Sequence, residues 1–263
     1  MNLLYTDNLT NLSTNYLINP GKYGGFLIRY SGTAQAGQTV TLANLGNVIF
    51  NAEGKDKINV DAEFLSFAAN LYGGFIEADS AVGGAFNFSI WIPSGVWFDP
   101  VNILDLRKDK DATFKLDFPA MTAALIASGN VQISGILQPG VQKYYHTMFS
   151  YNVVAGGAGV LTNTIAKSNI IELYIKNPAA LISTVQLSKD NVTYVNGNIA
   201  NELAYSNWIH QIEATGTFYA QEFASSKNIA QASGRNLTFN YNFTGAGTLA
   251  QYYSAVEWIA GGR

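Results

Sequence analysis

Two stretches of the chain, ASGNVQISGILQPGVQKYYHTMFSY (127–151) and ASGRNLTFNYNFTGAGTLAQYYSAVEWI (232–259), carry nearly the same pattern. Each opens on Ala-Ser-Gly, runs through a β-rich segment to a turn that contains glycine, and ends in a strand with a Tyr-Tyr pair. Self-similarity at a constant spacing is the usual sign of a duplicated structural unit. The echo therefore predicts that the chain is built from two copies of one fold.

The segments that lead into the two echoes also match. FPAMTAALIASG (118–129) and FASSKNIAQASG (223–234) have the same length and the same first and last residues. Proline suits the first position of a helix and glycine suits the position just after its end. We therefore expect a short helix over 119–128 and a weaker counterpart over 224–233.

Two upstream pairs extend the match. GGFLIRYSGTA (24–34) resembles SNIIELYIKNPAA (168–180), and AEFLSFAANLYGGFIEA (62–78) resembles NELAYSNWIHQIEA (201–214). The offset between copies is about 136 residues in the second of these pairs but 105 to 108 in the later segments. This difference predicts an insertion of roughly thirty residues in the first copy, spanning about 79–112.

Most of the remaining chain consists of short β-rich runs separated by Gly and Pro. The strands that these runs predict are 24–30, 47–50, 86–92, 113–118, 131–137, 144–153, 170–175, 184–187, 217–223, 237–243 and 252–259. In FNFSIWI (86–92) apolar and other residues alternate, which predicts a strand with one buried face. One helix is expected over 60–72, where Phe64, Leu65, Ala68 and Leu71 recur at helical spacing. The pattern is typical of a predominantly antiparallel β protein.

We therefore predict an all-β fold of two tandem eight-stranded antiparallel jelly rolls. Each has short helices, including one between its sixth and seventh strands. The expected divisions are an N-terminal arm (1–22), a first jelly roll (23–155), a glycine-bearing linker (156–167) and a second jelly roll (168–263).

Composition narrows the classes of function. Charged residues make up 13% of the chain, about half the roughly 25% usual in soluble proteins, and cysteine is absent. Such a weakly charged surface favours coverage by copies of the same chain. The net charge of −3, with scattered basic residues, gives no basic stripe for nucleic acid. The chain shows neither a signal peptide nor a membrane-spanning run, so we expect a protein that is made in the cytoplasm.

The sequence offers little for catalysis, and we expect no enzyme. Its two histidines, His146 and His210, lie far apart and lack neighbouring ligands at metal-binding spacing. Neither a nucleophile elbow nor a phosphate-binding loop is found. The acidic clusters at 53–63 and 105–111 are interleaved with Lys and Arg, which is typical of solvated loops. A structural calcium ion is an alternative for them, but their spacing fits no EF-hand and does not support it. No cofactor is expected.

Two jelly rolls in one chain resemble the double jelly-roll major capsid proteins of tailless icosahedral viruses, particularly those of membrane-containing bacteriophages. The paired segments 118–129 and 223–234, the Tyr-Tyr strands, and the opening strands at Gly24 and Ser168 carry this resemblance of layout. It covers the chain from about residue 23 to its end. The resemblance implies a homotrimer whose six barrels imitate a hexagon and tile a virion shell. It also implies neighbouring capsomers, penton or minor capsid proteins and an internal lipid membrane as partners.

Candidate contact residues fall in two groups. The arm has apolar positions suited to a neighbouring copy, although a strand or a frayed end of the first barrel is an alternative. Aromatic residues of the insertion would pack against the barrel or a neighbouring subunit. In a second reading, those aromatics form the sugar platform of a carbohydrate-binding or adhesin-type β-sandwich. The predicted contacts are Leu3, Leu4, Tyr5, Leu9, Leu12, Tyr16, Trp91, Trp97 and Phe98.

Overall fold

The computed structural model describes residues 1–9, 14–71, 78–96, 99, 101–108, 111–166, 169–189, 192–210, 218–223 and 237–259. The chain divides into two compact units. Unit 1 comprises Met1–Thr147 and Glu257–Arg263, and unit 2 comprises Met148–Val256. The division falls inside two long strands, β11 (Tyr144–Ala155) and β18 (Gly247–Trp258).

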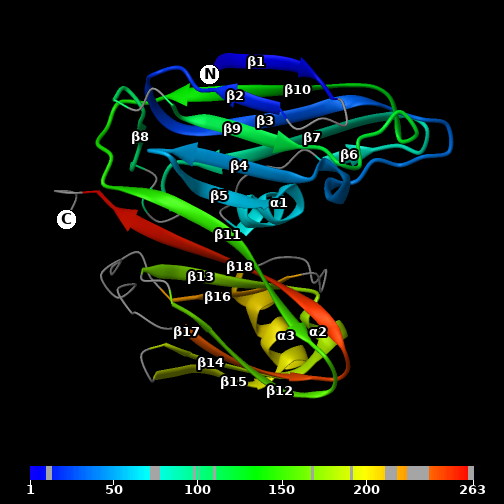
Figure 1. Cartoon of the computed structure of the whole chain (residues 1–263), viewed down its shortest axis with the longest axis vertical. Coiled ribbons are helices and arrows are strands. Elements are labelled where there is room, and N and C mark those ends of the chain that lie inside the picture. Colours follow the sequence, from blue (N-terminus) through cyan, green and yellow to red (C-terminus); the bar gives the residue numbers. More distant parts are fainter. Residues whose placement is uncertain are drawn as a thin grey trace. The chain divides into compact units, whose positions relative to one another are not determined.

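Unit 1 contains two antiparallel sheets (Figure 1). The first has the order β1-β10-β3-β7-β6, with β8 also paired to β3, and the second contains β2-β9-β4-β5. Their bounds are β1 Asn2–Asn8, β2 Thr14–Leu17, β3 Lys22–Ala34, β4 Asn47–Ala52, β5 Lys55–Asp61, β6 Ala78–Ser80, β7 Ala85–Pro93, β8 Leu104–Asp105, β9 Thr113–Asp117 and β10 Ile126–Leu137. Helix α1 (Ala62–Leu71) follows β5, and the 3-10 helix η1 (Leu42–Leu45) precedes β4.

Unit 2 repeats this arrangement with shorter connections. One sheet has the order β12-β17-β14-β15, and the strands β11-β18-β13-β16 form the other. The remaining bounds are β12 Gly159–Ile165, β13 Ile170–Lys176, β14 Ile182–Lys189, β15 Val192–Asn198, β16 Phe218–Glu222 and β17 Leu237–Phe243. Helix α2 (Pro178–Leu181) precedes β14, and α3 (Ile199–His210) follows β15.

The two units share one strand order. If β6 and β8 are set aside as short additions, the eight strands of unit 1 are β1, β2, β3, β4, β5, β7, β9 and β10. In both units the first, eighth, third and sixth strands form one sheet, and the second, seventh, fourth and fifth form the other. A helix, α1 or α3, lies between the fifth and sixth strands in each. This arrangement is a jelly roll, present twice.

A cluster of three phenylalanines joins the sheets of unit 1. Phe26 on β3 lies 5.0 Å from Phe114 on β9, and Phe114 lies 5.0 Å from Phe50 on β4, measured between ring centroids. All three are at most 3% exposed. The alternation expected in β7 is confirmed, since Phe86, Phe88, Ile90 and Ile92 are buried while the residues between them are half-buried. The core of unit 1 therefore lies between its sheets.

The core of unit 2 is built in the same way. Alternate residues of β17, namely Phe239, Tyr241 and Phe243, are at most 2% exposed, and the rings of Phe239 and Tyr241 stack 5.7 Å apart. Helix α3 adds Ile199 and Leu203 to this cluster. The alternate side chains of β17 all face the core because successive residues of a strand point to opposite sides of its sheet.

The helix expected over 60–72 is confirmed as α1, which begins two residues later than expected. Val60 and Asp61 remain in β5, and the Asp61 carboxylate accepts a 2.7 Å hydrogen bond from the backbone N–H of Phe64. This bond caps the first turn of the helix. Phe64, Leu65 and Ala68 form the buried face as expected.

The helix expected over 119–128 is not formed. The backbone N–H of Met121 bonds Phe118, and that of Leu125 bonds Thr122, so the segment makes separate turns. Ile126 already belongs to β10, whose long ladder with β3 uses the backbone groups that a helix would need. The counterpart expected over 224–233 lies outside the described residues.

The strand order also corrects how the two copies correspond. The matches of 24–34 with 168–180 and of 62–78 with 201–214 are confirmed, because they fall on the third strands and on α1 and α3. The match between 127–151 and 232–259 is displaced by one strand. It pairs β10 with β17, whereas β10 is an eighth strand and β17 a seventh.

The correct correspondence removes the insertion that we expected over 79–112. That segment contains β7, the sixth strand, which pairs with β3 over its whole length. The offset between equivalent strands instead falls over several connections, from 148 at the third strand (22 against 170) to 133 at the sixth (85 against 218) and 121 at the eighth (126 against 247). The first jelly roll is longer because its connections are longer.

The arm (1–22) and the linker (156–167) are also revised, since both contain strands of the jelly rolls. β1 pairs with β10 and β2 pairs with β9, while β12, within the expected linker, pairs with β17. These strands were missed because they are short or rich in Asn and Thr. Their backbone partners lie more than seventy residues away, so no local pattern reveals them.

Candidate assembly surfaces

The N-terminal residues predicted as contacts separate into buried and exposed sets. Leu9 is 5% exposed and Tyr16 is 4% exposed, so both pack inside unit 1. Leu4 and Tyr5 are half-buried, whereas Leu3 is 60% exposed. Leu12 lies outside the described residues. Of the described positions in this group, Leu3 presents the most surface to another molecule.

Tyr5 and Tyr16 bind β1 to β2. Their rings lie 5.3 Å apart between centroids, and the Tyr5 hydroxyl donates to the backbone carbonyl of Leu17. Burial, assisted by the nearby Asp7 carboxylate, raises the pKa of Tyr16 to about 12. These contacts make the first two strands part of the barrel rather than a detachable arm.

Trp91 lies across its own sheet. Gly25 on β3 has a φ of +157°, and a Cβ at this position would come within 2.4 Å of the Trp91 ring. The glycine therefore leaves room for the indole, which is half-buried against it. Trp97 and Phe98, the other members of the predicted aromatic platform, lie outside the described residues.

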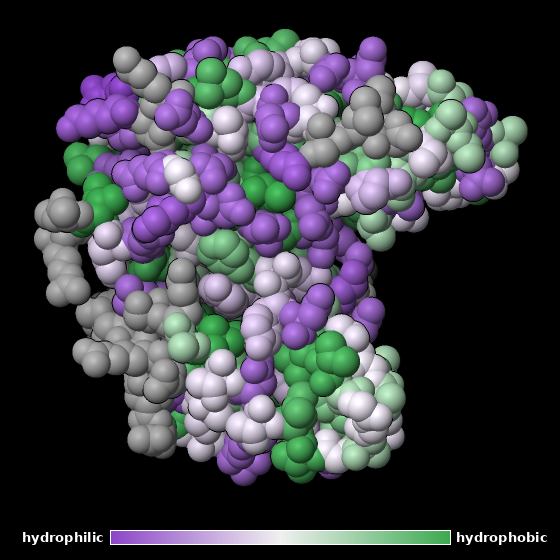
Figure 2. All heavy atoms as spheres, viewed as in Figure 1, coloured by the Kyte–Doolittle hydropathy of each residue, from purple (hydrophilic) through white to green (hydrophobic). Residues whose placement is uncertain are grey.

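The largest exposed aromatic residues in the described part of the chain lie on α3. Trp208 is 74% exposed and Tyr205 is 58% exposed, and their ring centroids are 6.2 Å apart with an angle of 30° between planes. Sequence reasoning missed this pair, although an aromatic pair three residues apart is a signal for a shared helix face. Elsewhere on unit 2, Val154 and Val160 are exposed, and Figure 2 shows hydrophobic residues gathered where Figure 1 draws β11 and β12.

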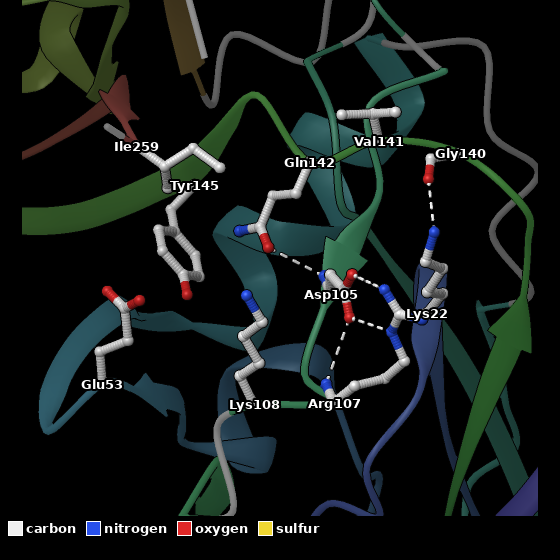
Figure 3. A pocket seen from close by; sticks show the side chains of 10 residues that line it. All are labelled: Lys22, Glu53, Asp105, Arg107, Lys108, Gly140, Val141, Gln142, Tyr145 and Ile259. Atoms are coloured by element: carbon white, nitrogen blue, oxygen red, sulfur yellow. Dashed lines mark hydrogen bonds and ion pairs between the residues drawn. The ribbon is translucent and has the colours of Figure 1, made fainter. Parts of the chain in front are cut away.

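A cleft of about 600 Å³ opens in unit 1 (Figure 3). Its polar side chains bond mainly to the protein: Lys22 donates to the Gly140 carbonyl at 2.8 Å, and Arg107 pairs with Asp105 at 2.7 Å. Gln142 accepts a 2.9 Å hydrogen bond from the backbone N–H of Asp105. These bonds fix the wall of the cleft, and they leave no nucleophile and base paired for catalysis among the side chains drawn.

The two histidines and the acidic clusters do not form a metal site in the described residues, where no group of three potential ligands occurs. His146 is 5% exposed, and burial lowers its pKa to about 4. The side chain of His210 is not among those described. No helix in the described part of the chain is both long and apolar enough to cross a membrane.

Comparisons with known proteins find relatives by structure alone, since no family model and no curated protein matches the sequence. The major capsid protein of bacteriophage PM2 aligns with a TM-score of 0.68 and 13% identity, over 99% of this chain and 96% of its own. The STIV MCP aligns with a TM-score of 0.71 and 11% identity, over 97% and 96%. The PBCV-1 virus capsid aligns with a TM-score of 0.67 and 9% identity, over 97% and 92%.

The chain therefore has the double jelly-roll fold of these viral major capsid proteins. The alignments run through both jelly rolls and cover nearly all of each chain compared. They include β1 and β2, so the likeness extends over the segment that the sequence pattern had left outside the barrels.

Proposed function

We propose that this chain is the major capsid protein of a tailless icosahedral virus, and that its copies assemble as homotrimers that tile the shell. Each trimer would present six jelly rolls in a pseudo-hexagonal arrangement. The function is assembly rather than catalysis, so no cofactor forms part of the proposal.

One observation carries this proposal most directly. The same strand order, with the same helix position, occurs twice and accounts for nearly all of the described chain. The PM2 major capsid protein and the STIV MCP share this layout over 97% or more of this chain. A trimer of two-barrel chains supplies six similar barrels, which is the number that a hexagonal lattice needs.

The proposal places the protein in the virion shell after synthesis in the host cytoplasm. Its first partner is a second copy of itself, followed by neighbouring capsomers. Penton or minor capsid proteins and an internal lipid membrane are further proposed partners, and bacteriophage origin is part of the same proposal. Direct binding of nucleic acid is not included, because the chain carries a net charge of −3.

Native mass tests the proposal. Three chains of 28.4 kDa predict a species of about 85 kDa by native mass spectrometry or analytical ultracentrifugation, or larger shell-like particles by electron microscopy. A chain that stays monomeric at high concentration and binds glycans instead would contradict the capsid role and support the carbohydrate-binding alternative.

A further inference from the structure

Helix α3 of unit 2 has an exposed face that is large, aromatic and uncharged. Trp208, Tyr205 and Ala204 are exposed, while Leu203 and Ser206 on the opposite side are buried. The Ser206 hydroxyl donates to the backbone carbonyl of Ala220 at 3.0 Å, which fixes the helix against β16. Because that bond and the buried Leu203 set the rotation of the helix, Tyr205 and Trp208 must point outward.

The equivalent helix of unit 1 shows no such face among its described side chains, 62–70. In α1 the side chains of Phe64, Leu65, Ala68 and Ala69 are buried, Phe67 is half-buried, and Asn70 is the exposed residue near the end. The two helices occupy the same position in the same topology, so the jelly-roll fold does not itself require an exposed aromatic pair. The pair is a property of the second jelly roll in particular.

The exposed area suits the centre of a protein interface. A buried Trp or Tyr side chain contributes roughly 150–250 Å². With Trp208 at 74% and Tyr205 at 58% exposure, the pair offers on the order of 300 Å². A stable interface needs about 800 Å² from each partner, so two residues would supply more than a third of it. Trp and Tyr are also the residues most enriched at energetic centres of interfaces.

Charge favours a second copy as the occupant. None of the exposed side chains in the described part of α3 is charged, so this face gives no electrostatic attraction to nucleic acid or to an anionic membrane. A copy of this chain, with charged residues at only 13%, is a matching partner for an uncharged aromatic face. Because the side chains described in α1 include no equivalent exposed pair, the contact joins α3 to a second α3 or to a different surface of the next copy.

We propose that Tyr205 and Trp208 on α3 form the anchor of a contact with a second copy of this chain. The inference rests on the proposed capsid function and specifies the surface through which copies meet. Removing the indole should weaken association without weakening the fold, since both rings lie outside the core.

The test compares W208S and W208F with V82S as a matched control. Val82 lies between β6 and β7 in unit 1 and is 71% exposed, so V82S removes an equally exposed apolar group that is not part of α3. Sedimentation across a concentration series should show W208S associating at least tenfold more weakly, which corresponds to about 1.4 kcal/mol. W208F should recover much of the affinity, and V82S should match the unaltered chain. Far-ultraviolet circular dichroism and thermal melting check that each variant folds.

Fluorescence gives a readout on the unaltered chain. Acrylamide should quench the fluorescence of Trp208 in dissociated chains and should lose access to Trp208 on assembly. The signal of Trp208 is the difference between the fluorescence of the unaltered chain and that of W208F. Assembly of W208S with unaltered affinity, or full quenching of Trp208 in the assembled state, would overturn this inference while the capsid function stands. A chain that never assembles overturns both proposals. Glycan binding that W208S abolishes, with association unchanged, would assign the pair to a sugar site instead.

Discussion

The ammonium group of Lys57 on β5 lies 3.0 Å from the carboxylate of Glu257, which lies near the end of β18 in the part of that strand that belongs to unit 1. Lys57 is 1% exposed, and its ammonium also lies 4.2 Å from the centre of the Tyr145 ring. The Glu53 carboxylate is a more distant neighbour at 3.9 Å. This buried cation joins residues two hundred positions apart within unit 1.

Removing one member of this pair should destabilise the protein more than removing both. E257Q leaves the Lys57 charge buried, and we expect a loss of about 1–3 kcal/mol in the free energy of unfolding, reduced from the fully buried case because Glu257 is 42% exposed. The double variant K57M/E257Q replaces the charge with an apolar side chain of similar length and should lose less than E257Q alone. Urea unfolding measures both variants, and a loss in K57M/E257Q that equals or exceeds the loss in E257Q would contradict this account of the pair.

The free energy of unfolding should decrease as the pH falls from 6.5 toward 4, because His146 stays neutral in the folded protein over this range. Burial holds the pKa of His146 at about 4, below the ordinary value of 6.5, so the unfolded chain takes up the proton first. The contribution is fully present above pH 6.5 and is lost as the pH decreases toward 4. Between pH 7.5 and pH 5 this loss is about 2 kcal/mol.

The variant H146N isolates this effect. Between pH 7.5 and pH 5, the free energy of unfolding of H146N should fall by about 2 kcal/mol less than that of the unaltered chain. A pH dependence that H146N leaves unchanged would show that His146 titrates normally in the folded protein.

Two glycines with similar φ angles should respond differently to alanine. Gly46 has a φ of +68°, and a Cβ there would lie 1.9 Å from the carbonyl oxygen of Asp117. Gly37 has a φ of +75°, and a Cβ there would meet nothing within 4 Å. G37A should cost about 1 kcal/mol through the backbone angle alone. G46A should cost a further 1–3 kcal/mol or so through the clash. Chemical denaturation of the two variants checks this, and equal losses would refute it.

The N-terminal segment should behave as part of the barrel. Y16A removes a ring that is 4% exposed, and we expect a loss of about 3–5 kcal/mol. L3S changes a side chain that is 60% exposed and should alter stability by less than about 0.5 kcal/mol. Deleting residues 1–18 should prevent unit 1 from folding, which limited proteolysis and circular dichroism would detect. A deletion variant that melts like the full chain would restore the interpretation as a detachable arm.

Local patterns were sufficient for most of the strands. Alternation and glycine-rich turns are encoded nearby in the chain, so they locate eleven strands within a few residues. These strands are β3, β4, β7, β9, β10, β11, β13, β14, β16, β17 and β18. The same patterns failed at 119–128, where good helix-forming residues are taken into turns and a long ladder. They also failed at β1, β2, β12 and β15, whose composition is ordinary for loops.

The candidate contact residues also differ in how much of their position the sequence reveals. Leu9 and Tyr16 look from the sequence like any other apolar residues in an Asn-rich segment, and only their pairing partners decide that they face the core. Tyr205 and Trp208 were overlooked for the opposite reason. An aromatic residue on a helix is usually buried, and the bond from Ser206 to Ala220 decides that these two are not.

The sequence by itself determined that this chain is all-β, that it contains a duplication, and that it carries neither a nucleophile elbow nor a phosphate-binding loop. These properties follow from composition and from periodicities that extend over a few residues. The tertiary structure decided which strands correspond, that the duplication reaches back to β1, and that Ala-Ser-Gly marks different strands in the two copies. Such facts depend on hydrogen-bonded partners far apart in the chain, and strands of similar composition are equivalent only when they pair with the same neighbours.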